Sequence, residues 1–146
     1  MTVDKVMRLV DANYNRAKEG LRVCEDIFRF VRDDREVTAR LKQVRHGLTA
    51  AADIVGFKAI LAARDIGHDV GRATIAEESA RGSVEDIFFA NIQRVKESLR
   101  VLEEFAKLSD KKASMAFKEL RYTVYEIEKI SLEKLQPLSD FGCRGL

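Results

Sequence analysis

The sequence is poor in the residue types that usually build metal sites or disulfide frameworks. It contains one proline, two cysteines and two histidines in 146 residues. Cys24 and Cys143 provide neither a disulfide framework nor a metal-binding spacing, and Cys24 lies on an apolar stripe that we expect to be buried. His46 and His68 are too few for zinc or for the di-iron sites of helical bundles. The scarcity of proline leaves long segments free to be helical.

Two kinds of partner are also excluded by what the sequence lacks. No apolar run approaches the roughly 18 residues that cross a bilayer, and the N-terminal segment has no signal-peptide pattern. The 26 basic and 24 acidic residues are interleaved and give a net charge of +2, whereas nucleic-acid binding requires clustered Lys and Arg. We expect a cytoplasmic protein of one domain that binds neither membranes nor nucleic acid.

Apolar residues instead recur at steps of three and four, which is the helical period. The first such stripe runs from residue 3 to about residue 32, and a second covers 37–55. After Gly56 a short apolar piece predicts another turn or two of helix. Further stripes follow over 88–106 and 117–135. The sequence therefore predicts an all-α fold with four main helices.

The chain also repeats itself, including its charges. The segments NYNRAKEGLRVCEDIFRF (13–30) and NIQRVKESLRVLEEFAKL (91–108) are identical at eight of eighteen positions. The strings RLKQVRHGL and AFKELRYTV then follow in the same order in each half. Gly20 and Ser98 share one repeat position, and their small size suits a close crossing of two helices.

This repeat predicts how the domain is organised. Residues 1–136 are expected to form a four-helix bundle built from two pseudo-symmetric helical hairpins, which bury their apolar stripes against each other. The repeat halves are about 1–64 and 83–136, joined by a long central loop. Residues 137–146 are expected to be a tail or a linker.

Some polar residues fall on the apolar arc of the predicted helices. On a helical wheel this holds for Asn13 and Arg16, and for Asn91 and Arg94 in the second half. A buried unpaired charge is costly, so each arginine needs a carboxylate, a phosphate or water. Glu19 borders the arc and is one possible partner. Two interpretations remain open, namely ligand binding and interhelical ion pairs that set the helix register.

Four other charged residues of the repeat are expected on the polar arc. Arg22 and Glu25, with Arg100 and Glu103, have the spacing of local ion pairs on a helix surface. We interpret them as structural.

The central segment DIGHDVGRATIAEESARGS has no helical stripe and predicts a long loop with an anion-binding composition. Glycines such as Gly71 let backbone N–H groups face an anion, and Arg64 can hold a phosphate with two N–H groups. Asp65 and Asp69 offer oxygens to Mg²⁺. Loops longer than roughly 12–15 residues in compact domains usually bind something or are disordered. We therefore predict that this loop, with Thr74, contributes to a ligand site.

These features together resemble a known family. The strings DANYNRAKEGLRVCED, ARDIGHDVG and ANIQRVKESLRVLEEF are similar to a helical domain of bacterial and archaeal thiamine biosynthesis, over about residues 10–129. That domain is often fused ahead of thiamine-phosphate synthase and also occurs separately. The resemblance implies an alternative hydroxymethylpyrimidine phosphate kinase, which uses ATP and Mg²⁺ to form the diphosphate. Thiamine-phosphate synthase is then a possible partner, and a symmetric bundle also allows a homodimer.

The reaction suggests roles for the candidate residues. Asp65 and Asp69 would bind Mg²⁺, and either of them or Glu19 would accept the hydroxymethyl proton. The residues expected to bind substrate or phosphate are Asn13, Arg16, Arg45, Arg64, Gly71 and Thr74, with Asn91, Arg94 and Arg121 as their counterparts in the second half. Two alternatives remain: a non-catalytic helical module that binds a pyrimidine phosphate or docks to the synthase, and a bundle enzyme of the chorismate-mutase kind.

Overall fold

The computed structural model describes residues 3–73 and 80–135, and these residues form helices and connecting segments without any strand. The predicted all-α fold is therefore confirmed. Among the described residues, no helix combines the length and apolar character needed to cross a membrane. The elements are α1 (Val3–Asp26), a π-helical turn (Ile27–Val31), α2 (Arg35–Val55), α3 (Phe57–Ala62), α5 (Val84–Ala106) and α6 (Lys111–Leu135).

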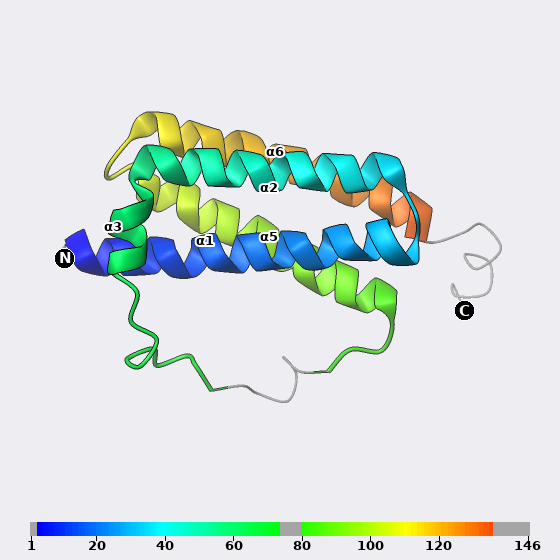
Figure 1. Cartoon of the computed structure of the whole chain (residues 1–146), viewed down its shortest axis with the longest axis horizontal. Coiled ribbons are helices and arrows are strands. Elements are labelled where there is room, and N and C mark those ends of the chain that lie inside the picture. The colour runs from blue at the N-terminus through cyan, green and yellow to red at the C-terminus, as the bar shows by residue number, and fades with distance from the viewer. Residues whose placement is uncertain (1–2, 74–79, 136–146) are drawn as a thin grey trace.

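The four long helices close a ring of contacts around one core. Helix α1 packs against α2 and α5, and α6 packs against the same two helices (Figure 1). Short α3 follows α2 and returns the chain to α1. From there the central segment leaves the helical body, and its described parts, 63–73 and 80–83, contain no helix, as predicted.

The predicted apolar stripes supply this core. Residues at the helical spacing, such as Leu21, Leu48, Leu99 and Ile127, have essentially no exposed surface. Burying a side chain of this size stabilises the fold by roughly 1.5–3 kcal/mol. Cys24 is buried among them, as expected. The core therefore draws on all four long helices.

The first helix departs from the prediction at its end. It was expected to continue as one helix to about Arg32, but its last turn is π-helical over Ile27–Val31. The wider turn keeps Ile27 and Phe28 buried and leaves Phe30 exposed. The chain then reverses through Asp33, whose φ is 52°. The side chain of Asp34 accepts a hydrogen bond from the backbone N–H of Val37 and caps the start of α2.

Helices α1 and α5 lie close together at Gly20, as the small residue there suggested. A Cβ added at Gly20 would lie 2.8 Å from Cγ2 of Val95 and 3.1 Å from the backbone oxygen of Asn91. Gly47 in α2 is different. Its added Cβ would meet only the Leu120 side chain, at 2.7 Å from Cδ2. A leucine end can rotate away, whereas a backbone oxygen cannot.

We predict opposite effects for alanine at these two glycines. Gly20→Ala should lower the free energy of unfolding by about 1–3 kcal/mol, because overpacking exceeds the gain in helix propensity. Gly47→Ala should be neutral or stabilising by up to about 1 kcal/mol. Urea denaturation followed by circular dichroism measures both. Equal effects would show that the Gly20 contact does not set the helix separation.

A second prediction concerns Cys24. Burial raises the pKa of this thiol to about 12, and alkylating reagents react with the thiolate. In a Cys143→Ser background, Cys24 should resist iodoacetamide at mildly alkaline pH and react quickly once guanidinium chloride unfolds the protein. Mass spectrometry of the labelled peptide measures this. Rapid labelling of the folded protein would contradict the burial.

Candidate functional site

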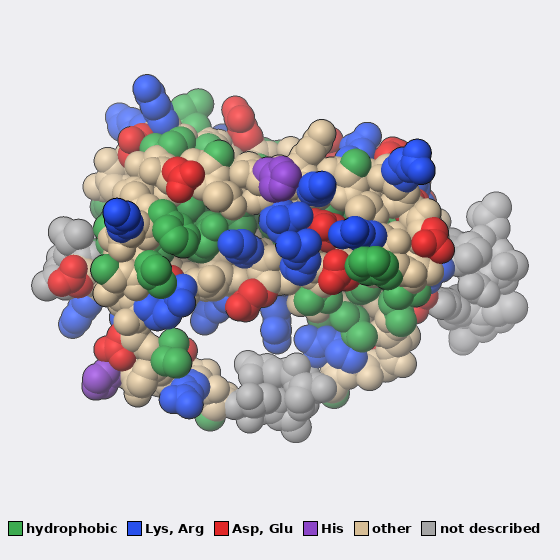
Figure 2. Space-filling view, viewed as in Figure 1, with side chains coloured by type: hydrophobic (Ala, Val, Ile, Leu, Met, Phe, Trp, Pro, Cys, Tyr) green, Lys and Arg blue, Asp and Glu red, His purple; other side chains and the backbone are tan. Residues whose placement is uncertain are grey.

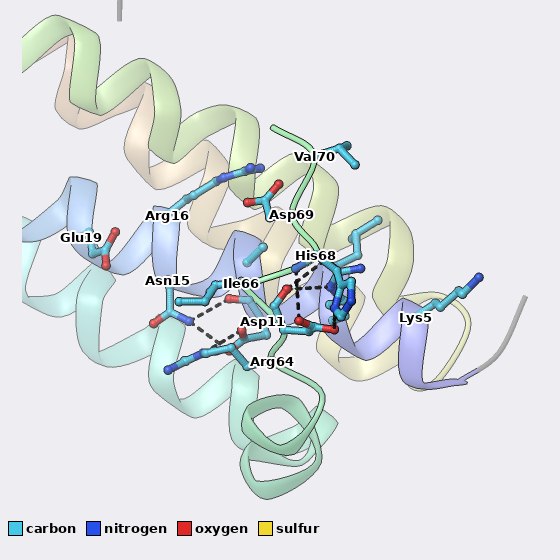
Figure 3. Close-up of a pocket in the computed structure, with 14 residues that line it drawn as sticks. Lys5, Asp11, Asn15, Arg16, Glu19, Arg64, Ile66, His68, Asp69 and Val70 are labelled. Carbon is cyan, nitrogen blue, oxygen red and sulfur yellow. Dashed lines mark hydrogen bonds and ion pairs between the residues drawn. The ribbon is translucent and has the colours of Figure 1, made fainter. Parts of the chain in front are cut away.

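An open cleft of about 710 Å³ lies between the N-terminal half of α1 and the segment that follows α3. Most of its lining residues are polar or charged, and Asp11 and Asn15 of α1 lie next to Arg64 of the segment after α3 (Figure 3). In Figure 2, Lys and Arg side chains line the edge of the helical body that faces the central segment. The cleft is lined by Lys5, Arg8, Leu9, Asp11, Ala12, Asn15, Arg16, Glu19, Arg64, Asp65, Ile66, His68, Asp69 and Val70.

A two-point ion pair joins the two walls of the cleft. Arg64 donates from Nε to Oδ2 of Asp11 and from Nη2 to Oδ1, both at 2.9 Å. The side-chain amide of Asn15 also donates to Oδ1 of Asp11, at 3.0 Å. The hydrogen bond to Asp11 raises the pKa of the Arg64 guanidinium above its ordinary value. The pair attaches the start of the central segment to α1.

Arg8, an arginine of α1, binds the next residue of the segment that follows α3. Arg8 donates from Nε and Nη2 to the backbone oxygen of Asp65, at 3.2 and 2.9 Å. The Asp65 carboxylate lies 2.7 Å from Nδ1 of His68, and this hydrogen bond lowers the pKa of Asp65. Oδ1 of Asp69 accepts from the backbone N–H of Gly71, at 2.9 Å. Two exposed carboxylates are thereby displayed beside the cleft.

Two charged side chains of the cleft, those of Arg16 and Glu19, are exposed to solvent. Arg16 and Glu19 form no hydrogen bond or ion pair with another described residue. In Figure 3 the Arg16 guanidinium extends from α1 toward Asp69 of the central segment. The prediction that Arg16 and its counterpart Arg94 lie on the buried apolar arc is wrong, because both side chains are exposed. Arg16 nevertheless lines the cleft, and Arg94 does not.

The two repeated asparagines, Asn13 and Asn91, each donate a hydrogen bond to the backbone of their own helix. Asn13 is buried and donates from Nδ2 to the backbone oxygen of Leu9, at 3.0 Å. Asn91 makes the equivalent bond to Ile87, at 2.8 Å. Neither asparagine lines the cleft. The structure therefore does not bring Asn13 together with the other expected substrate-binding residues.

Two ion pairs between helices involve charges that the repeat contains in both halves. Glu25 of α1 accepts from Nε of Arg45 in α2, at 3.0 Å, and the two side chains are 2% and 15% exposed. Glu103 of α5 accepts from Nε and Nη2 of Arg121 in α6, at 3.0 and 2.9 Å, and both side chains are 8% exposed. Glu25 and Glu103 were expected on the polar arc, and that prediction is wrong. Arg45 and Arg121 lie outside the 710 Å³ cleft and neutralise these carboxylates.

The local pairing expected on the helix surfaces is found in part. Arg22 lies 3.3 Å from Glu25, as the spacing predicted. Arg100 pairs with Glu104 at 3.0 Å instead of with Glu103. The reason is that Glu103 points into the interface with α6 and is occupied by Arg121.

The expected metal ligands lie close in sequence on the rim of the cleft. No cluster of three or more His, Cys, Asp or Glu side chains suited to a metal ion occurs in residues 3–73 and 80–135. Asp65 and Asp69 both line the cleft, and both carboxylate oxygens of Asp65 lie within hydrogen-bond distance of His68. The Mg²⁺ site expected on these aspartates stays a prediction. Thr74, the other expected loop residue, lies outside the described residues.

Sequence reasoning missed Asp11, Asn15 and Arg8, although the repeat contains a signal for two of them. At the offset of 78 residues, Asp11 aligns with Phe89 and Arg8 aligns with Asp86. These positions differ in charge between the halves, while the structural Asn, Arg and Glu positions agree. At these two positions the departure from the repeat marks the cleft, whereas Arg16 and Glu19 line it although both are repeated in the second half.

The fold and the cleft define a small helical domain with an arginine-rich and carboxylate-rich surface site. The chain belongs to the ThiD2 family, which matches residues 8–130. It is 43% identical to the thiamine-phosphate synthase of Synechocystis sp. over 124 residues, which are 84% of this chain and 35% of that protein. The thiamine-phosphate synthase of Thermosynechococcus vestitus is 39% identical over 134 residues, 90% of this chain and 37% of the relative.

A third relative comes from another organism. The thiamine-phosphate synthase of Rhodopirellula baltica is 36% identical over 121 residues, which are 82% of this chain and 32% of the relative. The chain thus spans about a third of the length of these curated relatives. No solved structure matches it significantly.

The buried ion pairs generate a prediction that separates structure from ligand binding. Arg121→Met should destabilise the fold by about 3–5 kcal/mol, because Glu103 is left buried with no cation. Arg45→Met should cost less, about 2–3 kcal/mol, because Arg22 still contacts Glu25. Chemical denaturation measures both. At a temperature where both variants remain folded, their affinity for hydroxymethylpyrimidine phosphate should equal that of wild type. A loss of this affinity only in Arg45→Met would support the phosphate-binding role predicted for Arg45.

Proposed function

We propose that this chain is an ATP-dependent kinase that converts hydroxymethylpyrimidine phosphate to the diphosphate in thiamine biosynthesis. Membership of the ThiD2 family and the similarity to thiamine-phosphate synthases support a role in thiamine biosynthesis. The single observation that carries the kinase proposal is the cleft itself. It places the uncommitted guanidinium of Arg16 and the exposed end of Arg64 beside the carboxylates of Asp65 and Asp69.

The two arginines suit the phosphates of this reaction. Phosphoryl transfer depends mainly on positioning and on compensation of negative charge. Arginine binds phosphate through several N–H groups held in one plane. Arg16 projects from the rigid helix α1, and Arg64 is held against α1 by Asp11. The phosphates of the acceptor and of ATP would therefore bind to Arg16, which belongs to α1, and to Arg64, which is bonded to α1.

The chemistry of the acceptor changes the role expected for the carboxylates. An oxygen of the acceptor phosphate attacks the γ-phosphorus of ATP, the bond from that phosphorus to the β,γ-bridging oxygen breaks, and ADP leaves. The attacking oxygen is already ionised at neutral pH, so the step needs no side chain to remove a hydroxymethyl proton. Asp65, Asp69 and Glu19 are therefore not required as general bases.

Asp69 and Asp65 instead fit the metal that accompanies ATP. Oδ1 of Asp69 is used by the N–H of Gly71, and Oδ2 has no hydrogen-bond partner among the described residues. Mg²⁺ bound here would neutralise charge on the transferred group. Glu19, which is exposed at the far end of the cleft, offers oxygens that suit the exocyclic amine of the pyrimidine.

The same observations support the finer architecture. We infer that the four long helices form a four-helix bundle of two pseudo-symmetric hairpins. The equivalent pairs Glu25–Arg45 and Glu103–Arg121 support this, because each joins the two helices of one repeat half at matching positions.

One observation favours a second candidate function. The chain spans about a third of relatives that carry the name thiamine-phosphate synthase. A non-catalytic module that binds a pyrimidine phosphate, or that docks to such a synthase, would also be compatible with that arrangement. The two candidates differ in whether the chain alone consumes ATP.

The test is a coupled assay for ADP release with hydroxymethylpyrimidine phosphate, ATP and Mg²⁺. We expect turnover that is lost when Mg²⁺ is chelated. Arg16→Gln should raise KM for the pyrimidine phosphate about tenfold or more, because a charged hydrogen bond to phosphate contributes about 1.5–3 kcal/mol. Asp69→Asn should mainly lower kcat.

The second half of the repeat supplies the matched control. Arg94→Gln removes the equivalent exposed arginine, which lies outside the cleft, and should leave both kinetic constants unchanged. If folded wild-type protein binds the pyrimidine phosphate without turning over, the binding-module alternative is correct. Equal losses with Arg16→Gln and Arg94→Gln would show that the cleft is not the site.

A further inference from the structure

We infer that Asp11 is a positioning residue: it orients Arg64 so that the outer N–H groups of the guanidinium receive the phosphate of the ligand, at one site per chain. This inference rests on the proposed function, because it takes the ligand to be a pyrimidine phosphate. It assigns a role to a residue that itself does not need to touch the ligand.

The two partners of the ion pair are very differently exposed. The side chain of Asp11 is 7% exposed, and that of Arg64 is 43% exposed. Both carboxylate oxygens of Asp11 accept from Arg64, and Asn15 further restrains one of them. Two in-plane hydrogen bonds determine the orientation of a planar guanidinium. The Asp11 carboxylate is therefore an anchor within the protein, and Arg64 is the exposed end of the pair.

The pair leaves part of the guanidinium available. A guanidinium carries five N–H donors, and two of those on Arg64 are used by Asp11. The group on Nη1 has no hydrogen-bond partner among residues 3–73 and 80–135, and the residue lines the cleft. The anchored side of Arg64 thus faces α1, while donors remain for a ligand.

A carboxylate beside a phosphate site has an electrostatic cost. Asp11 and Arg64 together are neutral, so Asp11 cancels attraction that Arg64 alone would exert on a phosphate. Orientation and charge therefore predict opposite results for removal of the Asp11 charge. If orientation dominates, phosphate affinity falls; if net charge dominates, it rises. The experiment can decide between them by the sign of the change.

The second half of the repeat lacks this arrangement. Phe89 occupies the position of Asp11, and Asp86 occupies that of Arg8. The smaller recess on that half, of about 300 Å³, contains Lys96, which is paired with Glu128 at 2.9 Å. Among the described residues, only the first half joins an aspartate of the helix to an arginine of the following segment. The described part of the second half therefore has no equivalent anchored arginine.

Calorimetric titration with two probes tests the inference. The probes are hydroxymethylpyrimidine phosphate and the unphosphorylated hydroxymethylpyrimidine. Wild type should bind the phosphate at one site per chain. Asp11→Asn keeps the size of the side chain but replaces one acceptor oxygen with a donor, so affinity for the phosphate should fall about tenfold. Affinity for the unphosphorylated probe should not change.

Arg64→Lys provides a second variant, because it keeps the charge at an exposed position and removes the planar fork. It should show the same selective loss, and Asp11→Asn should have no further effect in that background. Phe89→Leu, at the equivalent position of the second half, should bind both probes as wild type does.

The outcomes separate this inference from the proposed function. Wild-type protein that binds neither probe would overturn the proposed function. Wild-type binding with unchanged or increased phosphate affinity in Asp11→Asn would overturn only the positioning role. An equal loss for both probes would also overturn it, because a purely structural residue would act that way. Two phosphate sites per chain would overturn the assignment to a single half.

Discussion

The packing of this protein depends on carboxylates that are buried between helices and neutralised by a guanidinium from another segment. Glu25 and Glu103 each meet an arginine of the neighbouring helix. A buried carboxylate without such a partner would cost several kcal/mol. Each pair therefore requires its two helices to keep one axial and rotational position relative to each other. The two pairs occupy matching positions of the sequence repeat, so the same requirement applies to α1 with α2 and to α5 with α6.

The pair of Asp11 and Arg64 applies the same chemistry to a different purpose. It joins α1 to the segment after α3 and has no equivalent among the described residues of the second half. One partner is buried and the other is exposed to the cleft, so the interaction connects the helical core to a surface. Four repeated charges stabilise the scaffold as ion pairs between helices, whereas the cleft combines the unrepeated Asp11 with Arg16, whose repeat counterpart lies outside the cleft.

The sequence was sufficient to predict the elements and their apolar core, but not which charged side chains are buried. The apolar stripes, the short piece after Gly56 and the irregular central segment all followed from periodicity. The helical wheel failed for Arg16 because it gives an angle and not the extent to which a neighbouring helix covers that angle. Val23, two turns further along the same face, is itself 36% exposed. The wheel also could not show that Glu25 lies under α2, since that depends on how the hairpin closes.

The candidate site was predictable only in part. Arg64, Asp65 and Asp69 were predicted because they begin a long segment without a helical stripe, and long loops in compact domains usually bind something or are disordered. Asp11 was missed because a single aspartate on a helix is ordinary until its three-dimensional partner is known. The partner is 53 residues away in the chain, and no local pattern encodes that distance.

The π-helical turn at Ile27–Val31 lies in the region where the two repeat halves differ in length. The matching segments lie 78 residues apart in the first helix of each hairpin and 76 apart in the second, so the first hairpin contains two more residues at its bend. A π-turn accommodates additional backbone without breaking the helix. The two additional residues lie between Glu25 and Arg45, in the part of the chain that contains the π-turn and the bend. The bend that follows the π-turn is attached to both α5 and α6, because Arg32 pairs with Glu85 and Lys134 pairs with Asp34.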